Sequence, residues 1–167
     1  GRDLLARRLD IADTLAPLLA TDFDEHSFQL SPDGRWIVYV SDESGRDEVF
    51  ARPFPDTRAS KYQVSVAGGI APRWSRDGRE LYYVDPQQRL MAVRVRAGTS
   101  METEDPQPLF DLSPAMQEIA ASWFTPYDVM PDGRFVMVRS VTPAVTDGFL
   151  SVRVIENWLS AVQGTRR

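Results

Sequence analysis

The stretch that decides the fold reads Ser31-Pro32-Asp33-Gly34-Arg35-Trp36-Ile37-Val38-Tyr39-Val40. Proline presets the φ angle at the second position of a turn, and glycine accepts the positive φ that closes it. The residues after the turn are aromatic, β-branched or long and apolar, and they show no helical period. The stretch therefore predicts a tight turn followed by a β-strand over residues 35–41.

The same pattern occurs twice more along the chain, at residues 75–84 and at residues 130–138. The Asp-Gly pairs of the three copies are 44 and then 55 residues apart, a spacing typical of propeller blades. We therefore expect an all-β chain that forms a partial β-propeller of about three four-stranded antiparallel blades. A short helical turn is expected after Ile155, with Trp158 packed on the last blade.

The strand after the first turn is apolar on both of its faces. Trp36, Val38 and Val40 alternate with Ile37 and Tyr39, so neither set can face water. A strand of this kind must be covered on both sides, as it is between stacked blades.

The whole chain is interpreted as one repeat region. Residues 4–9 resemble residues 49–54, and residues 16–19 resemble residues 107–110, so residues 1–22 are expected to hold the last two strands of an incomplete blade. Residues 23–66 and 67–111 each form a blade, and residues 112–167 form the last blade with its C-terminal turn. The polar stretch Ala97–Pro106 is expected to be a mobile loop.

Closed propellers contain about four to eight blades, which is more than this chain supplies. An open arc exposes apolar blade faces at its ends. We expect additional N-terminal blades, or a second copy of the chain, to cover them.

Composition excludes several classes of partner. The net charge is −5 and the Lys and Arg residues are scattered among acids, which argues against nucleic acid or an anionic membrane surface. The chain has no cysteine, so it has no disulfide framework and no thiolate metal site. No apolar run is long enough to cross a bilayer, and direct membrane insertion is not expected. Composition alone does not indicate the cellular compartment.

Most candidates for chemistry have a structural explanation. The turn residues Asp33, Gly34, Asp77, Gly78, Asp132 and Gly133 are expected to stabilise the turns. The acidic loop over residues 42–48 lacks the alternate-position spacing of a calcium site, and a solvated hairpin is favoured over a cation site. His26 is the one histidine, and no Gly-x-Ser-x-Gly or protein-kinase signature is present. We therefore predict no catalytic residue, no metal and no cofactor.

A contact surface is expected where loops precede the inner strands, at residues 22–26, 68–73 and 122–127. Trp123 and Tyr127 follow a long insertion, where exposed aromatic side chains would mark a binding patch for a protein or peptide. The contact residues predicted on this face are Asp24, Glu25, His26, Arg73, Trp123 and Tyr127.

The turn-and-strand motif, together with Ala71-Pro72-Arg73-Trp74-Ser75-Arg76-Asp77-Gly78, resembles the WD40-like propeller repeat of TolB. The order of the blades, which ends in a strand and Asn157-Trp158-Leu159, is most similar to the C-terminal propeller region of bacterial serine/threonine kinases. The resemblance implies a non-enzymatic interaction, sensor or scaffold module of bacterial origin, placed in the periplasm or on the cell surface. The same repeat occurs in prolyl oligopeptidase-like peptidases, so a gating propeller whose catalytic domain lies elsewhere is the alternative. Met130 departs from the motif, which prefers serine.

Overall fold

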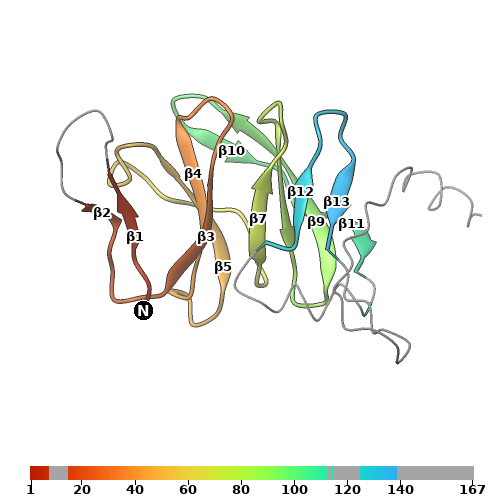
Figure 1. Ribbon diagram of the computed structural model, residues 1–167, viewed down its shortest axis with the longest axis horizontal. Helices are drawn as coiled ribbons and strands as arrows, with labels where there is room; N and C mark the ends of the chain where they lie inside the picture. Colours follow the sequence, from red (N-terminus) through yellow and green to blue (C-terminus); the bar gives the residue numbers. More distant parts are fainter. Residues whose placement is uncertain (8–14, 113, 115–124, 139–167) are drawn as a thin grey trace, which may run out of the picture.

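The computed structural model describes residues 1–7, 15–112, 114 and 125–138. Within them the chain is all-β and forms antiparallel sheets that stand side by side along the long axis of the molecule (Figure 1). Trp123 and the expected C-terminal turn around Trp158 lie outside the described residues.

The sheets follow one another in chain order. β1 (Leu4–Ala6) pairs with β2 (Ala16–Leu19). The next sheet has the order β3 (Glu25–Leu30), β4 (Trp36–Ser41), β5 (Glu48–Pro53), β6 (Tyr62–Gln63). The third contains β7 (Ile70–Trp74), β8 (Glu80–Val84), β9 (Arg89–Ala97), β10 (Met101–Thr103) and β11 (Gln107–Asp111), with β10 and β11 both paired to β9. β12 (Tyr127–Val129) pairs with β13 (Phe135–Met137).

The connections gather at two ends. The β3–β4, β7–β8 and β12–β13 turns lie together at the top of Figure 1, which we call the turn end. The N-terminus and the β4–β5 connection lie at the bottom, which we call the loop end.

β4 shows why the sheets stack, because all of its residues are buried. Trp36, Val38 and Val40 share a core with Trp74 and Leu81 of the following sheet. Its opposite face, Ile37 and Tyr39, packs with Leu4 and Leu19 of the preceding two-stranded sheet. The prediction of a strand covered on both faces is confirmed, and the chain is a partial β-propeller.

The two-stranded sheet β1–β2 sits against its neighbour as the outer half of a blade does. The backbone N–H of Glu25 donates to the carbonyl of Arg2 at 2.8 Å. Forty-four residues on, the N–H of Gly69 donates in the same way to the carbonyl of Asp47, at 2.9 Å. β1 therefore takes the place of β5 relative to the next sheet, and the two inner strands of its blade are not among the described residues.

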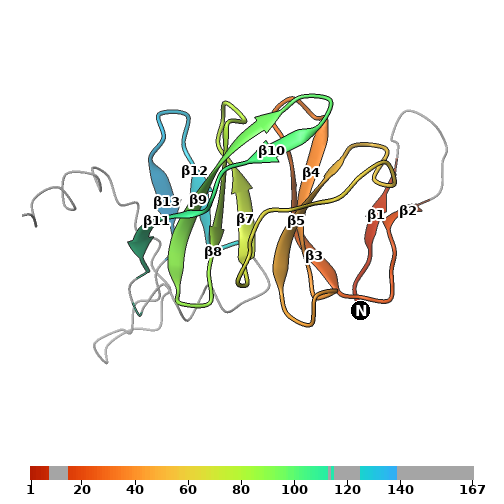
Figure 2. The same cartoon turned by 180° about the vertical axis from the view of Figure 1, so that it is seen from behind.

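The stretch Ala97–Pro106 is not the mobile loop that its polarity suggests. It contains β10, whose Met101 pairs with Ala97 and whose Thr103 pairs with Val95. The Met101 side chain is buried in the core between the second and third sheets. This burial and the pairing of β10 with β9, which lie side by side in Figure 2, hold the hairpin against the sheets.

The first two turns are built on a serine hydroxyl. Ser31 Oγ donates to Asp33 Oδ1 at 2.6 Å and accepts from the N–H of Trp36 at 3.0 Å. Ser75 makes the matching bonds to Asp77 and Glu80. Gly34, Gly78 and Gly133 all have positive φ.

The third turn closes differently, because Met130 has no hydroxyl to offer. Its N–H donates to the carbonyl of Arg134 at 2.7 Å, one residue earlier than the bond from Ser31 to Trp36. The shorter turn reverses the faces of the strand that follows. Phe135 therefore packs on Tyr82 of the preceding sheet, with ring centroids 4.9 Å apart, whereas Trp36 at the matching position packs toward the following sheet.

Candidate functional site

Each of the first two inner strands bulges near its start. The register shifts between His26 and Gln29 in β3 and between Ile70 and Arg73 in β7. Ser27 and Ala71, at matching positions of the repeat, both have a left-handed backbone, with φ of 51° and 55°. Because alanine adopts it as well, the strained conformation belongs to the bulge and not to the chemistry of the serine.

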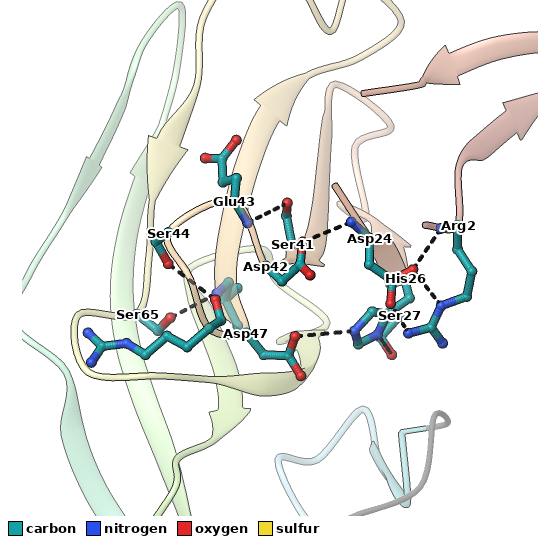
Figure 3. Close-up of polar contacts among 12 residues, drawn as sticks. Arg2, Asp24, His26, Ser27, Ser41, Asp42, Glu43, Ser44, Asp47 and Ser65 are labelled. Carbon is teal, nitrogen blue, oxygen red and sulfur yellow. Dashed lines mark hydrogen bonds and ion pairs between the residues drawn. The ribbon is translucent and has the colours of Figure 1, made fainter. Parts of the chain in front are cut away.

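A polar cluster surrounds the bulge of β3 at the loop end (Figure 3). The backbone N and Nε of Arg2 donate to Asp24 Oδ1 at 2.7 and 2.8 Å, and Arg2 Nη2 also donates to Asp24 Oδ2. The N–H of Asp24 donates to Asp42 Oδ1 at 2.9 Å. His26 Nε2 lies 3.8 Å from Asp47 Oδ1, and its Nδ1 lies 2.9 Å from Ser27 Oγ. The N-terminus, β3 and the β4–β5 connection thus meet in one place, which we call the Asp24–His26 cluster.

Charges within the cluster hold its groups in defined states. The hydrogen bond from the Arg2 side chain keeps the pKa of Asp24 well below its usual range, so Asp24 is ionised. Burial lowers the pKa of His26 below 6.5, and the positive charge of Arg2 lowers it further, while Asp47 and Asp24 act in the opposite direction. His26 is therefore neutral at pH 7.

The fold itself does not require these side chains. The positions 44 residues after Asp24, Glu25 and His26 hold Gly68, Gly69 and Ile70, which precede or begin the next inner strand. The same bulge thus forms without polar side chains at these three positions, and at β7 the carboxylate of Glu48 bonds the N–H of Gly68 from the neighbouring connection. A polar cluster that the scaffold does not need, at the end of a strand and beside a loop, is a candidate for binding.

The cluster contains Ser27, His26 and Asp47, the residue types of a hydrolase triad. A base and the group that orients it normally lie within hydrogen-bond distance, and the 3.8 Å between His26 and Asp47 is longer. Since the Ser27 backbone repeats at Ala71, we interpret the three residues as part of the contact surface and not as a nucleophile with its base.

Two predicted contact residues are buried instead. Glu25 is 3% exposed, lies opposite Ser41 in the sheet, and its Oε1 accepts a hydrogen bond from the Thr21 hydroxyl. Tyr127 is 4% exposed and its hydroxyl donates to the carbonyl of Ala71 at 2.9 Å. The expectation that Tyr127 is an exposed anchor is wrong, because it fills the interface with the preceding sheet. Its repeat position gives the signal: 55 residues earlier stands Pro72, which is also fully buried.

Arg73 lies apart from the Asp24–His26 cluster. It lines a hollow of about 440 Å³ with Phe28 of β3 and Asp128 and Val138 near the last hairpin. Its Nη1 donates to the carbonyl of Pro72 at 3.2 Å. The structure therefore brings Asp24 and His26 together and adds Arg2, Asp42 and Asp47, which sequence reasoning did not name as contact residues.

The acidic β4–β5 connection is organised around a buried carboxylate. Glu48 accepts hydrogen bonds from Arg46 Nε at 2.8 Å, from the N–H of Gly68 at 2.9 Å and from the Ser65 hydroxyl. These bonds tie the connection to the start of the next sheet. Over the described part of the chain, no group of three or more His, Asp or Glu side chains is arranged to hold a metal ion.

A hollow of about 850 Å³ lies at the turn end, between the first two turns and the β9–β10 hairpin. Its charges are balanced, since Arg35 pairs with Asp33 at 2.8 Å and Arg94 lies 4.0 Å from Glu104. The hollow therefore has no excess of positive or negative charge that would attract a charged ligand. In the same described segments, no helix is long and apolar enough to span a membrane.

The stacked antiparallel sheets define the chain as a propeller-type all-β protein, and a comparison with solved structures gives the same result. A structure assigned as TolB from Agrobacterium tumefaciens is similar to this chain, with a TM-score of 0.51 at 20% sequence identity. The match covers 80% of this chain and 48% of that chain, so this chain spans about half the length of the structure it resembles. At this identity the likeness establishes a shared TolB-like fold. No family model and no curated protein sequence matches the chain.

Proposed function

We propose that this chain is a non-enzymatic protein-interaction module that contacts a protein or peptide through the Asp24–His26 cluster at the loop end. The observation that carries the proposal is the contrast between matching positions of two blades. Asp24 and His26 surround the bulge of β3, whereas Gly68 and Ile70 occupy these positions at β7. Because the strand bulge forms without Asp24 and His26, these side chains can be used to bind a partner.

The charge around the cluster favours a basic partner. Asp22, Asp42 and Asp47 are exposed at this end, and Asp24 is ionised. Arg2 neutralises only part of this charge. A partner that carries Lys or Arg is therefore favoured, and a face of this kind steers association in a salt-dependent way.

The test is selection of a random peptide library on the immobilised chain, followed by fluorescence polarisation with the selected peptides at low and high salt. We expect basic peptides whose affinity falls with salt and falls about tenfold or more in His26→Ala and Asp47→Ala. Arg58→Ala is the matched control, because Arg58 is exposed on the β5–β6 connection and lines no part of the cluster. Peptides that bind all three variants as they bind the parent chain would refute the assignment of this surface.

We also propose which kind of protein this propeller belongs to. The turn-and-strand motif supports a propeller that serves a bacterial serine/threonine kinase or a TolB-like scaffold, acting outside the cytoplasm. A kinase domain encoded before residue 1 of the parent gene would support the kinase-associated propeller. A Gly-x-Ser-x-Gly sequence encoded after residue 167 would instead favour the gating propeller of a peptidase.

A further inference from the structure

A small hollow lies between the second and third sheets at the loop end, next to the Asp24–His26 cluster. Its volume is about 230 Å³. It is lined by Asp47 of the β4–β5 connection, by Gly68 and Gly69 just before β7, and by Gln88 of the β8–β9 turn. Pockets that bind whole small-molecule ligands measure about 300–1,000 Å³. This hollow is smaller, and its volume suits one long side chain.

The two neighbouring interfaces of the repeat differ at this place. The carbonyl of Asp47 accepts the N–H of Gly69, as the carbonyl of Arg2 accepts the N–H of Glu25, so Asp47 stands where Arg2 stands one sheet earlier. At the first interface the Arg2 side chain pairs with Asp24. At the second interface the residue 44 positions after Asp24 is Gly68, which has no side chain. The second interface therefore has a carboxylate and no base opposite it.

The charges around the hollow leave Asp47 uncompensated. The Asp85 side chain accepts hydrogen bonds from the backbone N–H and the Nε of Arg89, both at 2.8 Å. Arg46 already pairs with the buried carboxylate of the β4–β5 connection. Among the described residues, the one charged or titratable partner of Asp47 within 4 Å is His26, at 3.8 Å (Figure 3). Since His26 is neutral at pH 7, the negative charge of Asp47 has no cation beside it.

Gln88 adds a second acceptor to the lining of the hollow. Its Oε1 is buried, and no described residue donates a hydrogen bond to it. A buried carbonyl oxygen without a donor is unfavourable, and most such groups in folded proteins have a partner. The hollow thus lacks positive charge and N–H donors, which are the two properties that lysine and arginine side chains bring.

We infer that this hollow binds the cationic side chain of one lysine or arginine of the partner, between the Asp47 carboxylate and the Gln88 amide. The inference rests on the proposed function and names the residue that the loop end recognises. An ammonium or guanidinium group would give Asp47 the charge pair that Arg2 gives Asp24. A neutral side chain of the same length would leave Asp47 and Gln88 without partners.

The first experiment uses single amino-acid probes and does not require a known partner. The ¹⁵N-labelled chain is titrated with Nα-acetyl-lysine methylamide, Nα-acetyl-arginine methylamide and the uncharged Nα-acetyl-norleucine methylamide. We expect saturable shifts of the Gly68 and Gly69 amide signals with a basic probe at millimolar concentration, and none with the norleucine probe. Unmoved Gly68 and Gly69 signals with both basic probes would overturn the inference.

The second experiment separates recognition from folding. Gln88→Met keeps the length of the side chain and removes its amide oxygen. We expect affinity for the basic probes and for the selected peptides to fall about fivefold or more. Thermal stability should not fall, because an unpaired buried group is removed. Gln87→Met is the matched control, since Gln87 is the exposed neighbouring glutamine and does not line the hollow.

The outcomes distinguish this inference from the proposed function. Selected basic peptides that lose affinity in His26→Ala, but bind Gln88→Met as they bind the parent chain, would overturn the inference and leave the proposed function standing. A selection that yields no basic peptide would refute the proposed function. Shifts of the Gly68 and Gly69 signals with a basic probe, reduced in Gln88→Met and not in Gln87→Met, would still support the hollow as a cation site.

Discussion

At the scale of single residues, the serine that opens each of the first two turns decides the register of the strand that follows. Its hydroxyl bridges the Asp side chain of the turn and a backbone N–H five residues further on. Met130 lacks this bridge, and the third turn closes one residue earlier. The turns with serine and the turn with Met130 thus go with opposite facings of the strand that follows.

Removing the bridge should weaken the fold. Ser31→Ala leaves the N–H of Trp36, which is buried, without its partner, and we expect a loss of about 1–3 kcal/mol in the free energy of unfolding. Urea denaturation measures it. Ser44→Ala is the control, because that hydroxyl is exposed and donates only to the carbonyl of Arg46. Equal losses in the two variants would contradict the role given to Ser31.

His26 should make stability depend on pH in a defined direction. Burial lowers its pKa in the folded chain below 6.5, so the folded chain binds this proton less readily than the unfolded chain. The stability that neutral His26 contributes to the folded chain is fully present above pH 6.5 and is lost as the pH falls below 6.5. Denaturation of the parent chain and of His26→Gln on both sides of pH 6.5 measures this, and we expect the variant to lose less stability on acidification. Parallel pH profiles would show that His26 does not contribute.

At the scale of elements, β4 and β8 each separate two hydrophobic cores, because both strands are buried on both faces. Leu81 of β8 is fully buried against β4. We expect Leu81→Ala to cost about 2–5 kcal/mol of unfolding free energy, because it removes a packed side chain and leaves a cavity. Leu109→Ala, on the exposed side of β11, should change stability by about 0.5 kcal/mol or less, measured by the same denaturation.

The contrast between β4 and β10 shows how far sequence carries a prediction of this fold. β4 is predictable because its turn, its composition and its apolar faces are all local signals that agree. β10 carries no such signal, since Gly98-Thr99-Ser100 reads as a loop. β10 forms because the Met101 side chain packs in a core built by two sheets, and these contacts join residues far apart in the sequence.

The candidate site divides in the same way. His26 could be found from the sequence as the one histidine near the start of an inner strand. Its neighbours Arg2 and Asp47 could not, because the fold brings them in from other segments. The burial of Tyr127 is not predictable from the sequence, because the exposure of an aromatic residue after an insertion depends on the sheet beside it.

At the scale of the whole molecule, the repeated turns predict a common response to acid. Hydrogen bonds from Ser31 and then from Arg35 lower the pKa of Asp33 to about 2, and bonds from Ser75 and Arg79 lower the pKa of Asp77. Their folded pKa values lie below the ordinary value of 3.8, so the stability they supply is present above pH 3.8 and is lost as the pH falls toward 2. Asp33→Asn should flatten the fall in unfolding free energy over this range, and Asp105→Asn, at an exposed acid on the β10–β11 connection, should not. An unchanged profile in Asp33→Asn would refute the argument.

The 44-residue period has a consequence for how such chains change in length. Ser31 and Ser75 hold the same place in successive sheets, and each sheet presents to the next one the kind of surface that it receives from the one before. Duplicating residues 31–74 would therefore add one whole sheet whose two faces already match their new neighbours. Recombination between repeats can lengthen or shorten such an arc in single steps, without new contacts having to arise by point mutation.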